Sequence, residues 1–410
     1  MSPQTIDDAA PRLEVTRGAA AHTQHHVPAL DGVRGIAIIL VLLYHFVTSL
    51  EVLGLSSPYL ILFHFGWCGV DVFFTLSGFL ITGILLDTKN APHYFKSFYV
   101  RRILRIFPLY YLTIFAVLLL RTALPQAGVW GIYDTPWAPG SLWWPTLLLQ
   151  NVANIRHGVD PTGVLTHYWS LAVEEHFYLV WPLLVWLLPR RWILAVALTA
   201  AFSSLAIRAL LFHHVTDIFT IFDLTPLRMD GLAIGAIAAV ELRARGAAAL
   251  ARPALLLLIT TMAMLAILFL LRRTPLQNDH AVWLFCYPLV AVCTAAILLL
   301  GSAGGRIARM LSAAPLRWFG KYSYGLYVWH PVIGMLLFHS RVAVFPEGGG
   351  TALYLAIAAA ILILDLTVAW VSFHLWEKRF LDLKRYFPAA THQTKPFWKT
   401  AARPVEDVSS

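Results

Sequence analysis

The stretch that decides the fold is LDGVRGIAIILVLLYHF, residues 30–46, an apolar run that reads as part of a membrane helix. An arginine, Arg34, stands near its beginning and a histidine, His45, near its end. On an α-helix, residues eleven positions apart differ by about 20° in direction and lie about 16 Å apart along the axis. Arg34 and His45 are therefore expected on one face of a single helix, separated by about half the thickness of the hydrocarbon core.

The composition of the whole chain agrees with a membrane protein. Of its 410 residues, 59% are hydrophobic and only 13% are charged, against about 25% charged in ordinary soluble domains. The mean hydropathy is +0.68. The net charge of +9 does not indicate a nucleic-acid binder, because the basic residues punctuate apolar runs instead of gathering on a polar patch. The sequence predicts an all-α fold, a polytopic bundle of transmembrane helices.

Membrane-spanning segments are recognised by length, because a helix needs about 20 apolar residues to cross the hydrocarbon core. Ten segments meet this requirement, and a further stretch at 140–155 is too short and too interrupted by proline. We expect that stretch to lie at the interface, with Trp143 and Trp144 at headgroup depth. The ten spans are expected at about 34–54, 67–87, 103–121, 167–188, 192–212, 227–242, 253–271, 281–300, 321–340 and 352–376.

The lysines and arginines predict the orientation. With the N-terminus in the cytoplasm, all but seven of the 31 Lys and Arg residues fall on the cytoplasmic side, as the positive-inside rule requires. We therefore expect a multi-pass protein of the inner (plasma) membrane with both termini in the cytoplasm. The loop 122–166 would then lie on the outer face as a lid or acceptor-binding surface. Three regions follow: a disordered cytoplasmic tail at 1–28, a membrane domain at 29–380 and a cytoplasmic C-terminal tail at 381–410.

The pair Arg34 and His45 suits a long substrate with an anionic head and a reactive tail. Acyl-coenzyme A has this shape: its phosphates would rest on Arg34 while its thioester reaches His45. The alternative is structural, since a terminal arginine commonly snorkels to the interface and one intramembrane histidine can bridge two helices. Ionisable groups inside a bilayer are costly and usually mark functional sites, and this favours the functional interpretation.

The second span, GVDVFFTLSGFLIT at 69–82, carries two candidate residues. Asp71 either orients the imidazole of His45 or is solvated at the outer mouth of the bundle. Ser77 is not part of a Gly-x-Ser-x-Gly nucleophile elbow, so the Ser77–Gly78 pair is interpreted as a site of close helix packing.

A basic cluster opens the third span, in RRILRIFPLYY at 101–111. Arg101, Arg102 and Arg105 would lie at the cytoplasmic level near Arg34, where forked guanidinium groups bind phosphate well. Cytoplasmic helix ends carry arginine in many membrane proteins, however, so the cluster alone does not establish a site.

Two further motifs place charges and a histidine inside spans: YWSLAVEEHFYLVWP at 168–182 and SYGLYVWHP at 323–331. In the first, Glu174 and Glu175 point to different helix faces, so at most one addresses a shared site. One of the two is expected to pair with a cation such as Arg228, a structural role. In the second motif, His330 precedes Pro331, and a proline kink is the first explanation for it.

Metal and disulfide chemistry find no support in the sequence. The three cysteines, Cys68, Cys286 and Cys293, show no CxxC spacing and are interpreted as packing residues. No His-Glu-x-x-His or comparable metal-binding motif occurs. We expect no bound metal and no permanently bound cofactor.

Together the five motifs quoted above, with RMDGLAIGAI at 228–237, resemble the acyltransferase-3 family of integral membrane acyltransferases. They follow in order along the chain, and the resemblance covers residues 30 to about 380. The Arg-x10-His pair resembles the family's hallmark. The resemblance implies O-acyl transfer, with acetyl as the expected group, from acyl-coenzyme A as co-substrate to a hydroxyl of an envelope glycan or lipid-linked sugar. By that likeness His45 is catalytic and Arg34, Arg101, Arg102 and Arg105 serve the donor.

Two mechanisms and one rival function stay open at this stage. His45 would act as general base toward the acceptor hydroxyl, with Asp71 and Glu174 as further catalytic candidates, or would form an acyl-histidine intermediate. Tyr44 is a candidate donor to the oxyanion. The rival is a transporter or flippase of an amphiphile, in which Arg34, Glu174 and Arg228 line the path.

Overall fold

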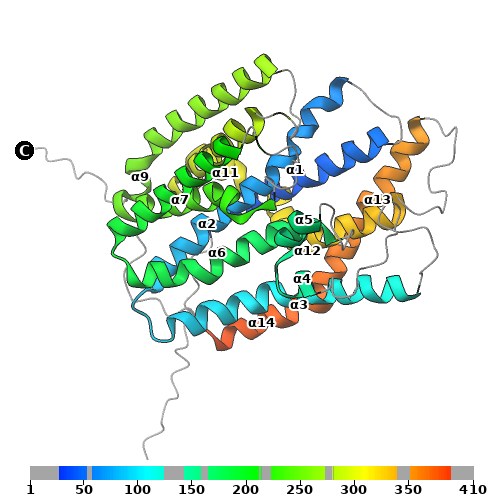
Figure 1. Cartoon of the computed structure of the whole chain (residues 1–410), viewed down its shortest axis with the longest axis horizontal. Helices are drawn as coiled ribbons and strands as arrows, with labels where there is room; N and C mark the ends of the chain where they lie inside the picture. Colours follow the sequence, from blue (N-terminus) through cyan, green and yellow to red (C-terminus); the bar gives the residue numbers. More distant parts are fainter. Residues whose placement is uncertain are drawn as a thin grey trace, which may run out of the picture.

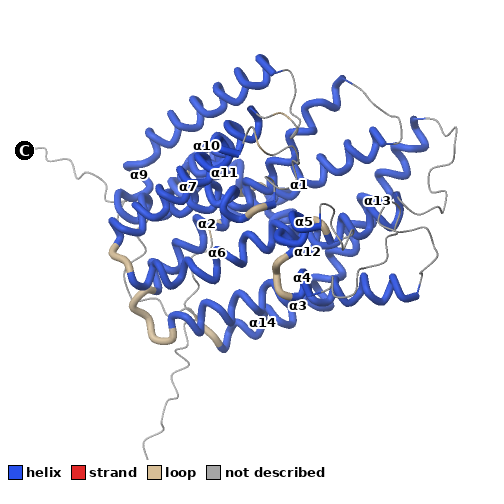
Figure 2. The backbone as a smooth tube through the Cα atoms, in the orientation of Figure 1, coloured by secondary structure: helices blue, strands red, loops and turns tan. Residues whose placement is uncertain are grey.

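The computed structural model describes residues 27–52, 58–123, 143–157, 165–211, 214, 223–272, 279, 281–338 and 351–388. Within these ranges every regular element is a helix (Figure 2). The predicted N-terminal tail and much of the loop 122–166 lie outside the described residues.

The helices lie side by side in one bundle (Figure 1). In chain order they are α1 (Pro28–Val52), the 3₁₀ helix η1 (Pro58–Cys68), α2 (Gly69–Thr88), α3 (Tyr94–Ala123), α4 (Trp143–Thr146), α5 (Gln150–His157), α6 (Tyr168–Leu187), α7 (Arg190–Leu211), α9 (Thr225–Arg272), the π-helix η4 (Val282–Cys286), α10 (Tyr287–Ala303), α11 (Gly305–Leu311), α12 (Ala314–Phe338), α13 (Thr351–Ser372), the π-helix η5 (Phe373–Glu377), α14 (Lys378–Asp382) and the 3₁₀ helix η6 (Leu383–Tyr386).

The all-α bundle is confirmed, and each of the ten predicted spans lies largely in a helix. The segments 227–242 and 253–271 both belong to α9, which is interrupted where Gly246 adopts a φ of 77°. By length and hydropathy, seven helical runs of the described chain are able to cross a membrane, with α9 counted once and without α6 and α12. The number of spans and the orientation stay predictions.

Two close helix crossings fix the centre of the bundle. At the crossing of α1 with α12, a Cβ added at Gly35 would overlap the carbonyl oxygen of Leu316, and one at Gly320 would overlap that of Asp31. At the crossing of α2 with α9, Gly78 and Gly235 are equally tight. Only glycine allows two helix backbones to approach so closely. The first crossing holds together the helices that carry Arg34, His45 and His330.

The short stretch after α3 folds as α4 and α5 and packs onto neighbouring helices. The Tyr110 hydroxyl on α3 donates to the carbonyl of Pro145 at 2.6 Å, and the Asn151 amide donates to Thr225 Oγ1 at 2.8 Å. Trp143 is exposed and stacks on the buried Trp144. These contacts are those of a segment that folds back on the bundle, while its depth in a bilayer stays a prediction.

Candidate functional site

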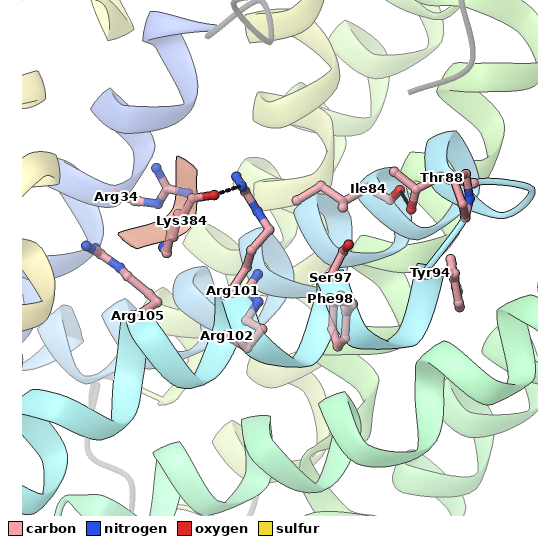
Figure 3. A pocket seen from close by; sticks show the side chains of 12 residues that line it. Arg34, Ile84, Thr88, Tyr94, Ser97, Phe98, Arg101, Arg102, Arg105 and Lys384 are labelled. Atoms are coloured by element: carbon pink, nitrogen blue, oxygen red, sulfur yellow. Dashed lines mark hydrogen bonds between the residues drawn. The ribbon is translucent and has the colours of Figure 1, made fainter. Parts of the chain in front are cut away.

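A cavity of about 200 Å³ opens at one end of α1 and is lined by five basic side chains. Arg34 comes from α1, the arginines of the RRILR motif come from α3, and Lys384 comes from η6. Figure 3 shows these side chains approaching one another from the three elements. The basic residues of this cavity, which we call the cationic cavity, are Arg34, Arg101, Arg102, Arg105 and Lys384.

The predicted gathering of Arg34 with the three arginines of the third span is therefore present in the structure. Arg34 is close enough to Arg102 and Arg105 for their charges to repel. Asp31 offsets part of this repulsion, since its Oδ1 accepts from Arg34 Nη1 at 2.6 Å, one helical turn away. Glu174 lies near enough to Arg102 and Arg34 to act in the same direction. Like charges crowd together at a cost, so the cavity carries a net positive field that suits an anionic ligand.

The basic cluster lies farther from the start of helix α3 than the sequence indicates. We expected span three to begin at residue 103, whereas α3 begins at Tyr94 because YFKSFYV continues the helix backward. Arg101 is consequently about 10 Å, some two turns, inside the helix. That register brings the cluster beside α6, where Arg102 lies over the ring of Tyr178 at 4.7 Å from its centroid.

Besides lining the cationic cavity, Arg101 binds the C-terminal segment and holds it against α3. Its Nη1 donates to the carbonyl oxygens of Lys384 at 3.3 Å and Phe387 at 3.1 Å. Cations bind the carbonyl end of a helix favourably. This contact brings Lys384 into the cavity, although the sequence places residues 381–410 in a tail. The basic pair in LKRY at 383–386, a short distance beyond the last predicted span, was the available signal.

Glu174 connects to the cationic cavity through Tyr178. The Tyr178 hydroxyl donates to Glu174 Oε2 at 2.9 Å and also forms a hydrogen bond with Ser77 Oγ. The same ring supports the Arg102 guanidinium. Ser77 thus takes part in a polar network, while its neighbour Gly78 provides the close packing. The sequence did not single out Tyr178. Its spacing of one turn from Glu174 is visible in the sequence, but its contacts with Ser77 of α2 and Arg102 of α3 are not.

The pairing expected between a glutamate of α6 and Arg228 is wrong. Arg228, which is completely buried, donates from Nη2 to Asp71 Oδ1 at 2.7 Å. Its guanidinium also lies 3.9 Å from the ring centroid of Tyr287. The register of α2 against α9 places Asp71 and Arg228 opposite each other, and this cross-helix relation is invisible in the sequence.

Neither alternative for Asp71 holds in the structure. Asp71 is 2% exposed, so it is not solvated at a mouth, and its carboxylate pairs with Arg228 rather than with the imidazole of His45. A second buried pair lies beside it, in which Arg208 Nη2 donates to Asp230 Oδ2 at 2.5 Å. These four residues, Asp71, Arg228, Arg208 and Asp230, form a buried ion-pair core that joins α2, α7 and α9.

His45 lies on α1 about 16 Å along the axis from Arg34, as an unbroken helix requires. Its Nδ1 is 2.9 Å from the Val41 carbonyl oxygen. A carbonyl only accepts, so Nδ1 carries the proton, and in the neutral ring the lone pair is on Nε2. The imidazole is exposed, although Val41 and Leu42 on the same helix are buried. A general base needs a neutral imidazole with a free lone pair, and in this tautomer the lone pair is that of Nε2.

Other aromatic and imidazole rings surround His45. Tyr44 meets it edge-on with 5.2 Å between ring centroids, and His330 of α12 lies at 4.8 Å. His167, at the start of α6, lies 6.0 Å from His330. His176 is elsewhere, with Nδ1 2.8 Å from Thr225 Oγ1. The residues that sequence reasoning treated separately as His45 and His330 therefore share one site.

One helix, α1, thus carries both Arg34 of the cationic cavity and His45. In the described part of the chain, no group of three or more His, Cys, Asp and Glu side chains has the arrangement of a metal site. Cys286 and Cys293 are buried and Cys68 is partly buried, all as free thiols. The chemistry of the site rests on arginine, lysine, tyrosine, glutamate and histidine.

Comparison with known proteins identifies relatives along most of the chain. The sequence model of a protein family described as an acyltransferase domain matches residues 27–374. The peptidoglycan O-acetyltransferase OatA of Listeria monocytogenes is 27% identical over 92% of this chain and 60% of its own length. The putative peptidoglycan O-acetyltransferase YrhL of Bacillus subtilis is 29% identical over 76% of this chain and 49% of its own length.

The O-acetyltransferase OatA of Staphylococcus aureus is 27% identical over 76% of this chain and 51% of its own length. The chain thus spans about half to three fifths of these relatives. No solved structure matches. The family model covers the Arg34–His45 motif, the cluster of α3 and the His330 motif alike. The chain belongs to the acyltransferase-3 family.

Proposed function

We propose that the chain transfers an acyl group, in the simplest case acetyl, from acyl-coenzyme A to a hydroxyl of a cell-envelope glycan. The observation that carries the proposal is the geometry of α1, which has the cationic cavity at Arg34 and the imidazole at His45. The relatives add the acceptor class, because they are named for O-acetylation and two of them for peptidoglycan.

The cationic cavity would hold the phosphates of the donor. Coenzyme A carries a diphosphate and a further phosphate, and arginine binds such groups through two parallel hydrogen bonds. Five basic side chains with Asp31 as a nearby carboxylate leave a surplus of positive charge for them. A pantetheine arm that starts at this cavity and runs along α1 would bring the thioester toward His45.

His45 would act as the general base. Its Nε2 takes the proton of the acceptor hydroxyl as the oxygen attacks the thioester carbonyl. The C–S bond then breaks, the ester forms, and the coenzyme A thiolate takes the proton from the imidazolium. Positioned bases of this kind contribute about 10²- to 10⁴-fold to rate. Tyr44, edge-on to His45, would donate to the oxygen that gains charge.

Glu174 and Asp71 enter the proposal with different roles. Glu174 would orient Tyr178 and, through its ring, the Arg102 guanidinium. Asp71 would keep Arg228 neutralised inside the bundle. Both would act on the site through other residues.

The rival transporter function is less well supported. Arg228 would have to line a translocation path, yet it is completely buried and is held by Asp71 and by the Tyr287 ring. Charges that serve a path face a water-filled cavity.

The test is thiol release from acetyl-coenzyme A by the purified full chain in lipid, with soluble peptidoglycan strands as acceptor. Glycan-dependent release should be lost in His45→Ala and kept in His374→Ala. His374 is a matched control, because its Nδ1 forms the same bond, 2.9 Å to the Trp370 carbonyl, at the η5 end of the bundle. Equal release by wild type and His45→Ala would remove His45 from the mechanism. Intact acetyl-coenzyme A in every sample would reject acyl transfer.

A further inference from the structure

His330 carries a buried nitrogen that the proposed mechanism does not use. The side chain is 4% exposed, and its Nδ1 lies 2.9 Å from the Leu326 carbonyl oxygen. Because that oxygen only accepts, the ring proton is on Nδ1 and the lone pair of the neutral ring is on Nε2. Among the described residues, Nε2 has no hydrogen-bond partner and no exposed surface.

A structural role for His330 accounts for Nδ1 but leaves Nε2 unexplained. Pro331 has no N–H, so the Tyr327 carbonyl receives no backbone bond from position 331, while Nδ1 of His330 bonds to the neighbouring Leu326 carbonyl. A buried acceptor without a donor costs free energy and calls for a reason. Phenylalanine would fill the same space without that cost.

His330 and His45 face each other across the tight crossing of α12 with α1. Their ring centroids are 4.8 Å apart, with the planes inclined at 69°. Each ring is fixed by a bond from Nδ1 to the carbonyl four residues earlier in its own helix. The pair therefore offers two acceptor nitrogens of the same tautomer in one small region.

The chemistry of an acceptor nitrogen decides which substrate His330 can bind. The reacting end of an acyl thioester has a carbonyl oxygen and a sulfur, neither of which donates a hydrogen bond. A glycan has several O–H and amide N–H donors on each sugar. A neutral imidazole with its lone pair on Nε2 therefore selects the glycan and not the acyl group.

We propose that His330 is a specificity-determining residue for the acyl acceptor, with Nε2 accepting a hydrogen bond from an O–H or N–H of the acceptor sugar. His45 takes the proton of the reacting hydroxyl, and His330 holds a second donor of the same sugar unit. This inference rests on the proposed function and adds to it the acceptor's class, a sugar with two donors close together. A simple alcohol would satisfy only one of the two nitrogens.

The experiment measures initial rates of the full chain in lipid while acetyl-coenzyme A and soluble peptidoglycan strands are varied separately. His330→Phe keeps a ring of similar size but removes the acceptor, and should raise the KM for the glycan about ten- to one-hundredfold. The KM for acetyl-coenzyme A and the kcat should change less than about threefold. His330→Gln, whose amide oxygen accepts a hydrogen bond, should recover most of the glycan KM. His374→Phe is the control for loss of an imidazole from the bundle.

Two results would overturn the proposal: an unchanged KM for the glycan in His330→Phe, or a fall in kcat with both KM values unchanged. The second result would place His330 in the chemical step. If the wild type releases no thiol, the proposed function fails, and His330 is then tested by direct titration of the same glycan strands. Binding by wild type and His330→Gln but not by His330→Phe would keep the acceptor site, whereas equal binding by all three would reject it.

Discussion

Two regions of the molecule use arginine in opposite ways. In the ion-pair core, each of two buried arginines has its own aspartate, Arg228 with Asp71 and Arg208 with Asp230. In the cationic cavity, five basic side chains lie together with Asp31 as their neighbouring carboxylate. The first arrangement neutralises charge inside the bundle, whereas the second concentrates it where a ligand can enter. The difference teaches that arginine content does not locate a ligand site. What distinguishes the two regions is that each arginine of the core is bonded to its own aspartate, whereas in the cavity Asp31 is bonded to Arg34.

The largest effect is expected from breaking the core. Arg228→Met should lower the free energy of unfolding by about 3–5 kcal/mol, because it leaves Asp71 charged and buried without its partner. Thermal or denaturant unfolding in detergent measures this change. Arg272→Met is the matched control: its pair with Asp279, at 2.5 Å, involves an arginine that is half exposed. The control should cost at most about 1 kcal/mol. Equal losses would mean that burial of the pair is not what matters.

A loss in the cationic cavity should change affinity and not stability. Arg105→Gln is expected to raise the KM for acetyl-coenzyme A about ten- to one-hundredfold, since a charged hydrogen bond to phosphate contributes about 1.5–3 kcal/mol. The increase should shrink at high salt. Arg243→Gln serves as control, because Arg243 is already paired with Asp87 at 2.6 Å. An unchanged donor KM in Arg105→Gln would contradict the role given to the cavity.

Tyr178 allows the network beneath Arg102 to be separated into two parts. Tyr178→Phe removes the hydroxyl that joins Ser77 and Glu174 but keeps the ring under the guanidinium. It should raise the donor KM about two- to tenfold, in line with about 0.5–1.5 kcal/mol for a hydrogen bond. Tyr178→Leu removes the ring as well and should exceed this effect in the same assay. If Phe and Leu behave alike, the ring does not support Arg102.

The smallest effect is expected at Lys384. A lysine binds phosphate as a point charge and without the two-pronged geometry of arginine. Lys384→Met should therefore raise the donor KM only about two- to fourfold, measured by initial rates at low salt. Lys378→Met, in the preceding helix α14 and outside the cavity lining, is the control. A larger effect than that of Arg105→Gln would reverse the order of importance within the cavity.

The sequence predicts the bundle and its ten helical segments well, because hydrophobic length is a local property. It also predicts that Arg34 joins the RRILR cluster, since helix ends of one side share a level. The partners of Asp71, Arg228 and Glu174 were not predictable, because they depend on the rotation and register of one helix against another. The place of Lys384 in the cavity was not predictable for another reason. A basic residue after the last span is typical of any cytoplasmic helix end, and only the bond from Arg101 to the Lys384 carbonyl shows that this segment packs on α3.

The site histidines show the same division. His45 stands out by its distance from Arg34 along one helix, which sequence spacing gives directly. The role of His330 can be recognised only from the packing of α12 against α1 at their glycine crossing. In that packing the ring centroids of His330 and His45 are 4.8 Å apart. Local spacing therefore finds residues that share a helix, and packing decides which residues of different helices work together.

The central claim is that the donor binds at the cationic cavity while the chemistry takes place at His45. The most direct test is calorimetric titration of coenzyme A into the purified wild type, His45→Ala and the double variant Arg102→Gln/Arg105→Gln. His45→Ala should bind coenzyme A as the wild type does, although it should release no glycan-dependent thiol. The double variant should bind coenzyme A at least about tenfold more weakly. Loss of binding in His45→Ala, or wild-type binding by the double variant, would contradict the central claim.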